Sequence, residues 1–227
     1  MQAEQRQANP VQVVGIVGGI ASGKSLVCRE LAALGAVVLD ADKLGHAVLE
    51  EPAVRDVLRE RWGDAILDEA GRVDRPRVGR IVFGPPPEGP RERRFLESVT
   101  HPRISQRISD RLAEIRVAAQ ESSVGPVVVV LDAALLIEAG WRRWCDEVLF
   151  VECPDAVRRT RALARGWTEE AWRAREAVQR PLEEKRQVCT GTLDNSGSSA
   201  ETRRQVEDFW RRLTGVRPAS ADDSSRR

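Results

Sequence analysis

The eight residues Gly18–Ser25 carry the clearest chemical signal in the sequence. They read GGIASGKS and fit the pattern G-x-x-x-x-G-K-[ST], with an apolar run before them and an apolar helical pattern, Leu26–Leu34, after them. The backbone amides of such a turn, together with the N-terminus of the next helix, surround a phosphate group. Lys24 would then bridge the β- and γ-phosphates of a nucleotide, and Ser25 would ligate Mg²⁺.

The predicted nucleotide contacts are therefore this loop and the first residue after it. They are Gly18, Gly19, Ile20, Ala21, Ser22, Gly23, Lys24, Ser25 and Leu26. A glycine-rich strand-to-helix turn without a ligand is the alternative, and the flanking strand and helix patterns disfavour it. The motif by itself predicts nucleotide binding and leaves the reaction open.

Two carboxylates, Asp40 and Asp42, directly follow the second apolar run. Ligands of open α/β sheets bind at the carboxyl edge of the strands, and we expect this strand to neighbour the strand before the phosphate-binding loop. A carboxylate there accepts the proton of an attacking hydroxyl or holds Mg²⁺-bound water. Capping of a helix N-terminus is the alternative for either residue, and we favour Asp42 for the chemical role.

Asp132 and His101 are further candidates whose roles the sequence leaves open. Asp132 ends the third apolar run and is predicted either to orient the Mg²⁺ shell or to cap a following helix. His101 precedes Pro102 and a long helical pattern. It is therefore a candidate for substrate contact, for capping and for packing.

Four arginines, Arg158, Arg159, Arg161 and Arg165, follow the fourth apolar run. Such a run is typical of a solvated helical face. Arg161 and Arg165, however, are four residues apart and therefore share a face from which both reach one phosphate chain. The six tryptophans form no stacking ladder of the kind that binds single-stranded nucleic acid. Most are expected to pack in the core, and Trp167, which follows the four arginines, is a candidate ligand contact.

Short apolar runs alternate with helical patterns, which predicts a mostly parallel five-stranded sheet in a three-layer α/β/α fold. The five expected strands are Gln12–Val17, Ala36–Leu39, Val127–Leu131, Glu147–Val151 and Thr192–Leu193.

Two segments exceed what a crossover needs. Residues 43–125 contain helical patterns at Ala53–Trp62 and Ile104–Ala119 and no clear strand, which predicts a helical sub-domain inserted beside the sheet. Within them, Gly84–Pro90 reads GPPPEGP and is expected to be an exposed loop outside any helix. Residues 155–186 are helical and arginine-rich, and we expect a lid.

The rest of the chain is expected to complete one domain over residues 11–213, closed by a helix at Ser199–Leu213. Residues 1–10 and 214–227 are polar, and we expect flexible or disordered tails there. The N-terminal segment lacks the apolar core of a secretion signal, and the longest apolar run is too short to span a membrane.

Composition narrows the expected partners. Lys plus Arg number 36 and Asp plus Glu 35, so no global basic field favours nucleic acid. The four cysteines are widely spaced, without a CxxC pair, which favours a reducing, cytoplasmic setting over a disulfide framework. We expect no membrane and no nucleic-acid partner, and a monomer or weak homo-oligomer.

Several motifs in one order resemble those of the dephospho-CoA kinases, a family of adenylate-kinase-like P-loop enzymes. The resemblance runs from Val13 to Leu213 and rests on GIVGGIASGKS at Gly15–Ser25, VVLDADKLGHAV at Val37–Val48, THPRI at Thr100–Ile104, ALLIEAG at Ala134–Gly140, RALARGWTEEAWRAREAVQ at Arg161–Gln179, EEK at Glu183–Lys185 and DNSGS at Asp194–Ser198.

The resemblance implies transfer of the ATP γ-phosphate to the ribose 3′-hydroxyl of dephospho-CoA, the last step of coenzyme A synthesis, with Mg²⁺. It also implies that Asp42 serves the acceptor hydroxyl and His101 contacts the substrate. By the same likeness the lid arginines, Arg161 and the catalytic Arg165 among them, close over the phosphates, and Asn195–Gly197 border the adenine.

The chain departs from the family pattern at several positions. Ala21 replaces a usual third glycine, Ala134 replaces a usual proline, and Arg165–Trp167 read Arg-Gly-Trp in place of Arg-Asp-Gly. The loop Gly84–Pro90 looks like an extra insertion. These departures leave the phosphate-binding loop and Asp42 intact.

Two other classes of function remain as alternatives. Another small-molecule or nucleoside monophosphate kinase would share the loop, the lid arginines and Mg²⁺, and only the preferred acceptor separates it from a dephospho-CoA kinase. A non-catalytic nucleotide-dependent switch would bind a partner and hydrolyse ATP slowly without an acceptor. The sequence contains no NKxD motif that would support a GTPase.

Overall fold

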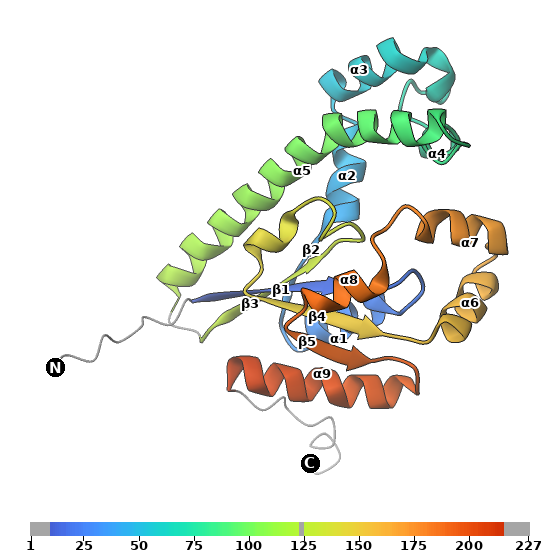
Figure 1. Cartoon of the computed structure of the whole chain (residues 1–227). Helices are drawn as coiled ribbons and strands as arrows, with labels where there is room; N and C mark the ends of the chain where they lie inside the picture. Colours follow the sequence, from blue (N-terminus) through green and yellow to red (C-terminus); the bar gives the residue numbers. More distant parts are fainter. Residues whose placement is uncertain (1–9, 123–124, 216–227) are drawn as a thin grey trace.

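A computed structural model describes residues 10–122 and 125–215, and its centre is a five-stranded, all-parallel sheet (Figure 1). All five predicted strands are confirmed, and each predicted bound is within one residue. The strands are β1 Val11–Val17, β2 Val37–Asp40, β3 Val127–Asp132, β4 Glu147–Glu152 and β5 Gly191–Asp194.

The helices of the described residues fall into three groups, which Figure 1 shows around the sheet. Those that flank the sheet at the two chain ends are α1 Lys24–Ala33 and α9 Ser199–Thr214. Those between β2 and β3, called here the insertion, are α2 Ala41–Leu49, α3 Pro52–Trp62, the 3₁₀ helix η1 Asp64–Ile66, α4 Arg75–Val82 and α5 Glu88–Glu121. After β3 come the 3₁₀ helix η2 Trp141–Trp144 and, between β4 and β5, the lid segment of α6 Asp155–Ala164, α7 Glu169–Glu176 and α8 Leu182–Gln187.

The strand order is β2-β3-β1-β4-β5, so β2 does not neighbour the strand that precedes the phosphate-binding loop. That expectation was wrong, because β3 pairs with β1 and β2 on its two edges. The pairing places Asp132, at the end of β3, opposite both Ile16 and Asp40. The order of strands therefore brings Asp132 between the loop and the carboxylates that follow β2.

Alternation along the strands divides the apolar core into two layers. In β1, Val14 and Ile16 pack with α1 and α9, whereas Val13 and Val17 pack with the layer that contains α2, α5 and η2. Both faces of a parallel sheet are buried when helices cover them, which is why β1 reads as a nearly continuous apolar run. The predicted α/β/α layering is confirmed.

Residues at both ends of the closing helix α9 determine where it begins and ends. Ser198 and Glu201 form a capping box at its N-terminus, and Gly215, with φ of 71°, follows its last residue. Phe209 and Trp210 are buried against α1 and the sheet. Thr214, which we assigned to the C-terminal tail, is instead the last residue of this helix.

Helix α5 is longer than the expected pattern at Ile104–Ala119 and continues through Pro102. A proline inside a helix removes one backbone hydrogen bond and costs about 3 kcal/mol. Buried residues on both sides of the proline, such as Thr100, Ile104 and Ile108, fix the helix against its neighbours, and this packing outweighs the local cost. His101 therefore lies inside the helix and does not cap one.

The segment GPPPEGP is only partly the exposed loop that we expected. Helix α5 begins at Glu88, so Glu88–Pro90 form its first turn, and Gly89 is buried. The first four amides of a helix have no acceptor within it, which is why a proline fits there without loss. The remaining residues, 84–87, connect α4 to α5.

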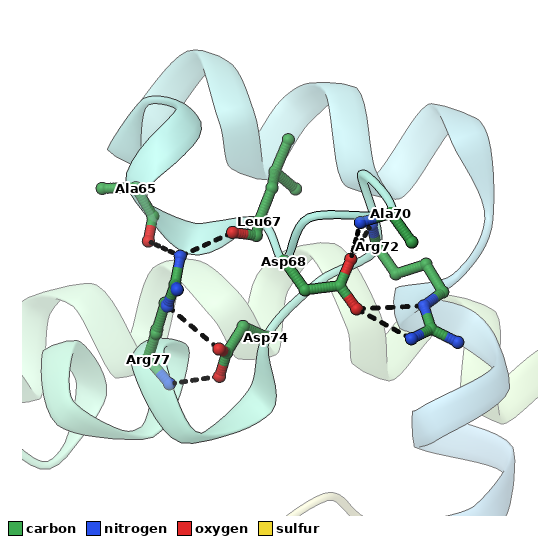
Figure 2. A network of polar contacts seen from close by, with 7 residues as sticks. All are labelled: Ala65, Leu67, Asp68, Ala70, Arg72, Asp74 and Arg77. Carbon is green, nitrogen blue, oxygen red and sulfur yellow. Dashed lines mark hydrogen bonds and ion pairs between the residues drawn. The ribbon is translucent and has the colours of Figure 1, made fainter.

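The connection between η1 and α4 is held by side chains that bind the backbone (Figure 2). Asp68 accepts hydrogen bonds from the amide and the Nε of Arg72, at 2.9 and 3.0 Å. Arg77 donates to the carbonyl of Leu67 at 2.6 Å and pairs with Asp74, which caps α4. These contacts give a fixed shape to a turn that sequence periodicity does not predict.

The expected tails, 1–10 and 214–227, lie outside the described residues except for Pro10, Thr214 and Gly215. Within the described ranges, no helix combines the length and the apolar character needed to cross a membrane.

Candidate active site

The loop between β1 and α1 has the geometry of an anion-binding turn. Gly18 and Gly23 adopt φ of 154° and 99°, which leaves the backbone free to wrap inward. Helix α1 begins with no side-chain cap and no acidic residue in its first turn. Its free amides and the positive end of its dipole are therefore available to a phosphate.

Ala21 occupies a conformation that usually requires glycine. Its φ is 62°, and it is the one non-glycine residue with positive φ in the described part of the chain. Its side chain packs with Ala162 and the fully buried Trp172 of the lid segment. Ala21 thus adopts the left-handed backbone conformation that a glycine at this position would supply.

Lys24 lies folded over the loop, with its Nζ donating to the carbonyls of Gly18 and Gly19 at 3.1 and 3.3 Å. Burial lowers the pKa of Lys24, while the negative charge of Asp132, and more weakly that of Asp42, opposes this shift. The amine thus lies within electrostatic reach of both candidate carboxylates.

Asp40 and Asp42 take different roles at the start of α2. Asp40 is the N-cap and accepts a hydrogen bond from the Lys43 amide at 2.9 Å. Asp42 is the second residue of α2, in its first turn, and is exposed to solvent. Partial desolvation by the surrounding protein, followed by repulsion from Asp40 and Asp132, raises the pKa of Asp42.

Asp132 caps no helix, because residues 133–140 form turns, and the capping alternative was wrong. Burial raises the pKa of Asp132, and a hydrogen bond from the Cys28 thiol and the charge of Lys24 lower it. Cys28 follows Lys24 by one helical turn on α1, so the two side chains lie on the same face of this helix.

Arg161 and Asn195 bind the phosphate-binding loop itself. Asn195 is buried, and its Nδ2 donates to the Ser22 carbonyl at 2.6 Å while its Oδ1 accepts from Thr202 at 2.7 Å. Arg161 donates to the same Ser22 carbonyl at 3.3 Å and to the Asn195 carbonyl at 3.0 Å. A Cβ on Gly23 would lie 1.9 Å from Asn195, so only glycine fits there.

Arg165 and Gly197 are exposed to solvent. Arg165 directly follows α6, and its guanidinium makes no ion pair or hydrogen bond within the described part of the chain, so this side chain is free to meet a ligand. Arg161 is bound to backbone carbonyls in this structure, and contact of Arg161 and Arg165 with one phosphate chain stays a prediction. A contact of Asn195 or Gly197 with adenine stays a prediction.

His101 is half-buried in α5, with its ring 5.5 Å from the ring of Trp141. Burial lowers the pKa of His101, so the neutral imidazole is favoured. Packing is thus part of its role, and contact with a substrate stays a prediction.

Sequence reasoning did not single out two contacts that hold the site together. Arg158, which is 3% exposed, donates to the Ile20 carbonyl at 3.4 Å and pairs with Asp155 and Glu176, joining the tip of the loop to α6 and α7. Lys185, which is 1% exposed, pairs with Glu138 at 3.0 Å. Lys185 is one of only three lysines in the chain, which was the available signal.

The loop, the parallel sheet and the strand order define a P-loop kinase fold. A family model described as dephospho-CoA kinase matches residues 12–201. Similar proteins include the dephospho-CoA kinases of Geobacillus kaustophilus (39% identical, covering 85% of this chain and 92% of the relative) and Thermobifida fusca (38%, covering 88% and 95%). The chain belongs to the dephospho-CoA kinase family.

Solved structures support the fold. A structure from Thermus thermophilus is 33% identical, with a TM-score of 0.72, and the match covers 90% of this chain and 98% of that one. A dephospho-CoA kinase from Campylobacter jejuni has a TM-score of 0.59 at 22% identity and supports the fold. The function of the chain is accordingly dephospho-CoA kinase activity, the final step of coenzyme A biosynthesis, in a family that uses ATP.

Proposed function

We propose that the chain transfers the γ-phosphate of ATP to the ribose 3′-hydroxyl of dephospho-CoA at the carboxyl edge of β1, β2 and β3. One observation carries the assignment of the site. Lys24 starts α1 after β1, Asp132 ends the neighbouring strand β3 in register with Ile16 and Asp40, and Asp42 lies in the first turn of the helix after β2. A cation for the phosphates and a carboxylate for the acceptor thus meet at one edge of the sheet.

The nucleotide would be held chiefly by the backbone of residues 18–26. The amides of the loop surround the β-phosphate, and Lys24 exchanges its bonds to Gly18 and Gly19 for phosphate oxygens. Arg161 and Asn195 act from behind the loop, because both bind the Ser22 carbonyl and so fix its curvature. Their contribution to ATP binding is therefore indirect.

The donor set fits a magnesium ion. Ser25 presents a hydroxyl at the N-terminus of α1, and Asp132 is a partly desolvated carboxylate whose raised pKa a nearby cation would offset. Within the described residues, no group of three or more His, Cys, Asp or Glu side chains forms a metal site. Mg²⁺ here would take its other ligands from phosphates and water, and it would neutralise charge on the transferred group.

Asp42 would orient the 3′-hydroxyl and accept its proton late in the transfer. Phosphoryl transfer passes through a loose transition state, so little proton removal precedes bond breaking. Most of the contribution is then alignment of the hydroxyl with the γ-phosphate. Arg165, exposed and unpaired in the described structure, would approach the phosphates from the lid segment and stabilise their charge during transfer.

Turnover with a panel of acceptors tests the proposal. Purified protein with ATP and Mg²⁺ should phosphorylate dephospho-CoA, and the mass of the product and its fragments should place the phosphate on the 3′-oxygen. Lys24→Ala should lower kcat/KM by a factor of about 10³. Arg29→Ala, which removes an exposed cation from the same helix, should not. Product from a nucleoside monophosphate or another metabolite alone would assign the site to a different small-molecule kinase.

The proposed setting follows from the sequence. We propose a cytoplasmic enzyme that acts as a monomer or weak homo-oligomer. Light scattering at the working concentration of the enzyme measures the oligomeric state directly.

A further inference from the structure

One arginine joins the lid segment to the insertion across the site. The guanidinium of Arg175, in the last turn of α7, lies 5.3 Å from the centre of the Phe83 ring and 4.7 Å from that of Trp167. Phe83 directly follows α4 of the insertion, and Trp167 lies between α6 and α7. A single cation therefore contacts one ring from each of the two parts, which are far apart in the sequence.

Arg175 forms no ion pair with a carboxylate in the described structure. Its Nη1 donates to the carbonyl of Ala171 at 3.1 Å, and no carboxylate pairs with it within residues 10–122 and 125–215. The neighbouring lid arginines Arg159 and Arg173 both pair with Glu169. Aromatic faces attract a guanidinium through their quadrupole, so the two rings attract the charge of Arg175 from outside its own helix.

Phe83 is not needed by the core of the insertion. The buried side chains of α4 are Val78 and Val82, whereas Phe83 is 42% exposed and is among the large apolar residues that the described surface exposes. Burial of part of an otherwise exposed ring against Arg175 favours contact between the two parts.

We propose that the contact Phe83–Arg175–Trp167, called here the aromatic bridge, couples binding of the acceptor to binding of ATP. The inference rests on the proposed function, in which the insertion serves dephospho-CoA and the lid segment serves the nucleotide. An acceptor that holds the insertion near the lid segment strengthens the bridge, and the strengthened bridge holds the lid segment over ATP. Arg175 is thus a positioning residue, and it makes each substrate bind more tightly in the presence of the other.

Calorimetry measures this coupling. The Kd of a non-hydrolysable ATP analogue with Mg²⁺ is determined with and without saturating dephospho-CoA, and the ratio of the two values is the coupling factor. We expect the wild-type protein to bind the ATP analogue about tenfold more tightly when dephospho-CoA is present. Phe83→Ala, which removes a ring and no charge, should bring the ratio close to one while leaving the Kd of the analogue alone within about twofold.

Matched variants separate the bridge from general effects. Phe83→Tyr keeps an aromatic face and should keep the coupling, and Arg175→Lys keeps a cation and should restore part of what Arg175→Ala loses. Arg173→Ala is the control, because Arg173 lies on the same helix and contacts Trp172, inside the lid segment. It should retain the wild-type ratio.

The outcomes are distinct. A wild-type ratio near one, or an unchanged ratio in Phe83→Ala with normal turnover, would overturn the bridge and leave the proposed function intact. If Arg175→Ala raises the Kd of the ATP analogue by the same factor with and without dephospho-CoA, then Arg175 is a phosphate ligand and the bridge is wrong. Absence of dephospho-CoA turnover in the wild type would overturn the proposed function and the bridge together.

Discussion

Asp42 lies in a field of like charge at the end of the parallel strands. Asp40, which caps α2, and Asp132, which ends β3, both repel its negative charge, and the surrounding protein excludes part of its water. A carboxylate that is harder to ionise is a stronger base once ionised, and it is better placed to take a proton from a hydroxyl. The same field makes its protonation state a useful experimental signal.

The pH dependence of kcat/KM should report Asp42. Because the pKa of Asp42 is raised, the carboxylate becomes protonated, and activity falls, at a higher pH than an ordinary aspartate with a pKa of about 3.9 would give. Asp40→Asn removes one repelling charge and should move this acid limb to lower pH with turnover retained. Asparagine also caps helices, so α2 should keep its stability to within about 0.5 kcal/mol.

Asp42→Asn is the companion variant, and it should lower kcat with dephospho-CoA by about 10²–10³-fold while calorimetry shows unchanged ATP affinity. Loss of activity in Asp40→Asn together with full activity in Asp42→Asn would transfer the acceptor role to Asp40. An acid limb that stays in place in Asp40→Asn would mean that the limb reports another group. Full activity in both variants would remove a carboxylate from the proposal.

At the residue scale, the sequence predicts a role when residues close in sequence determine the geometry. The loop Gly18–Ser25 and the capping alternative for Asp40 belong to this group, since a few neighbours in sequence set their geometry. Asn195 and Arg158 do not, because each acts on the backbone of the loop from a distance of more than 130 residues. Only the tertiary fold shows that Asn195 supports Ser22 from behind.

At the scale of elements, patterns of hydrophobicity predicted which segments form strands and helices, but not their neighbours. Every strand was predicted, yet the placement of β3 between β1 and β2 was not, because continuous apolar runs say only that both faces are buried. Likewise, Pro102 suggested a helix boundary, and α5 passes through it because the insertion packs along both halves. Contacts between residues far apart in the sequence determine both the position of β3 and the continuation of α5 through Pro102.

A buried ion pair fixes one end of the lid segment. Lys185 of α8 pairs with Glu138, in the turns after β3, and also donates to Gln179 at 2.9 Å. The same carboxylate accepts the Arg180 amide at 2.9 Å. The connection between α7 and α8 is thus attached to the segment that follows Asp132.

Lys185→Met should therefore lower the free energy of unfolding by about 3 kcal/mol, because it leaves the Glu138 carboxylate, which is only 17% exposed, without its charged partner. The double variant Glu138→Gln, Lys185→Met should recover part of this loss, since glutamine is neutral and still accepts the Arg180 amide. Denaturant titration of the four proteins in the cycle measures the coupling between the two residues.

Arg186→Met provides the control for this cycle. Arg186 is the next residue of α8 and pairs with Glu152, but half of its side chain is exposed, so its loss should cost less than about 1 kcal/mol. Equal losses in Lys185→Met and Arg186→Met would show that burial does not distinguish the two pairs.

For the whole molecule, the insertion and the lid segment lie on either side of the site, and the sheet with α1 and α9 forms the base (Figure 1). The chain has 36 basic and 35 acidic residues, so local groups attract phosphates and the net charge does not. Composition and periodicity predicted this division into a base and two helical additions. The contacts between the additions involve single side chains, such as Arg175, and no periodic pattern predicts them.

The lid segment should become more ordered when both substrates are bound. It contacts the rest of the molecule largely through single side chains: Arg158 and Arg161 bind the loop, and Trp172 packs on Ala21. Arg175 contacts Phe83, Lys185 pairs with Glu138, and Arg186 pairs with Glu152. Gly166, with φ of 80°, has open space around it and supplies a pivot between α6 and α7. Few contacts permit local opening, and ligands that bind across both sides of the site oppose it.

Hydrogen exchange with mass-spectrometric detection tests this expectation in the intact protein. A bisubstrate analogue that joins adenosine phosphates to dephospho-CoA should slow exchange of amides in α6 and α7 by at least about tenfold at saturation. Amides of α9, which packs on α1 away from the lid segment, serve as the internal control and should change little. Uniform slowing over all elements would indicate general stabilisation by the ligand. Unchanged exchange in α6 and α7, with the analogue shown by calorimetry to be bound, would mean that this segment does not act as a lid.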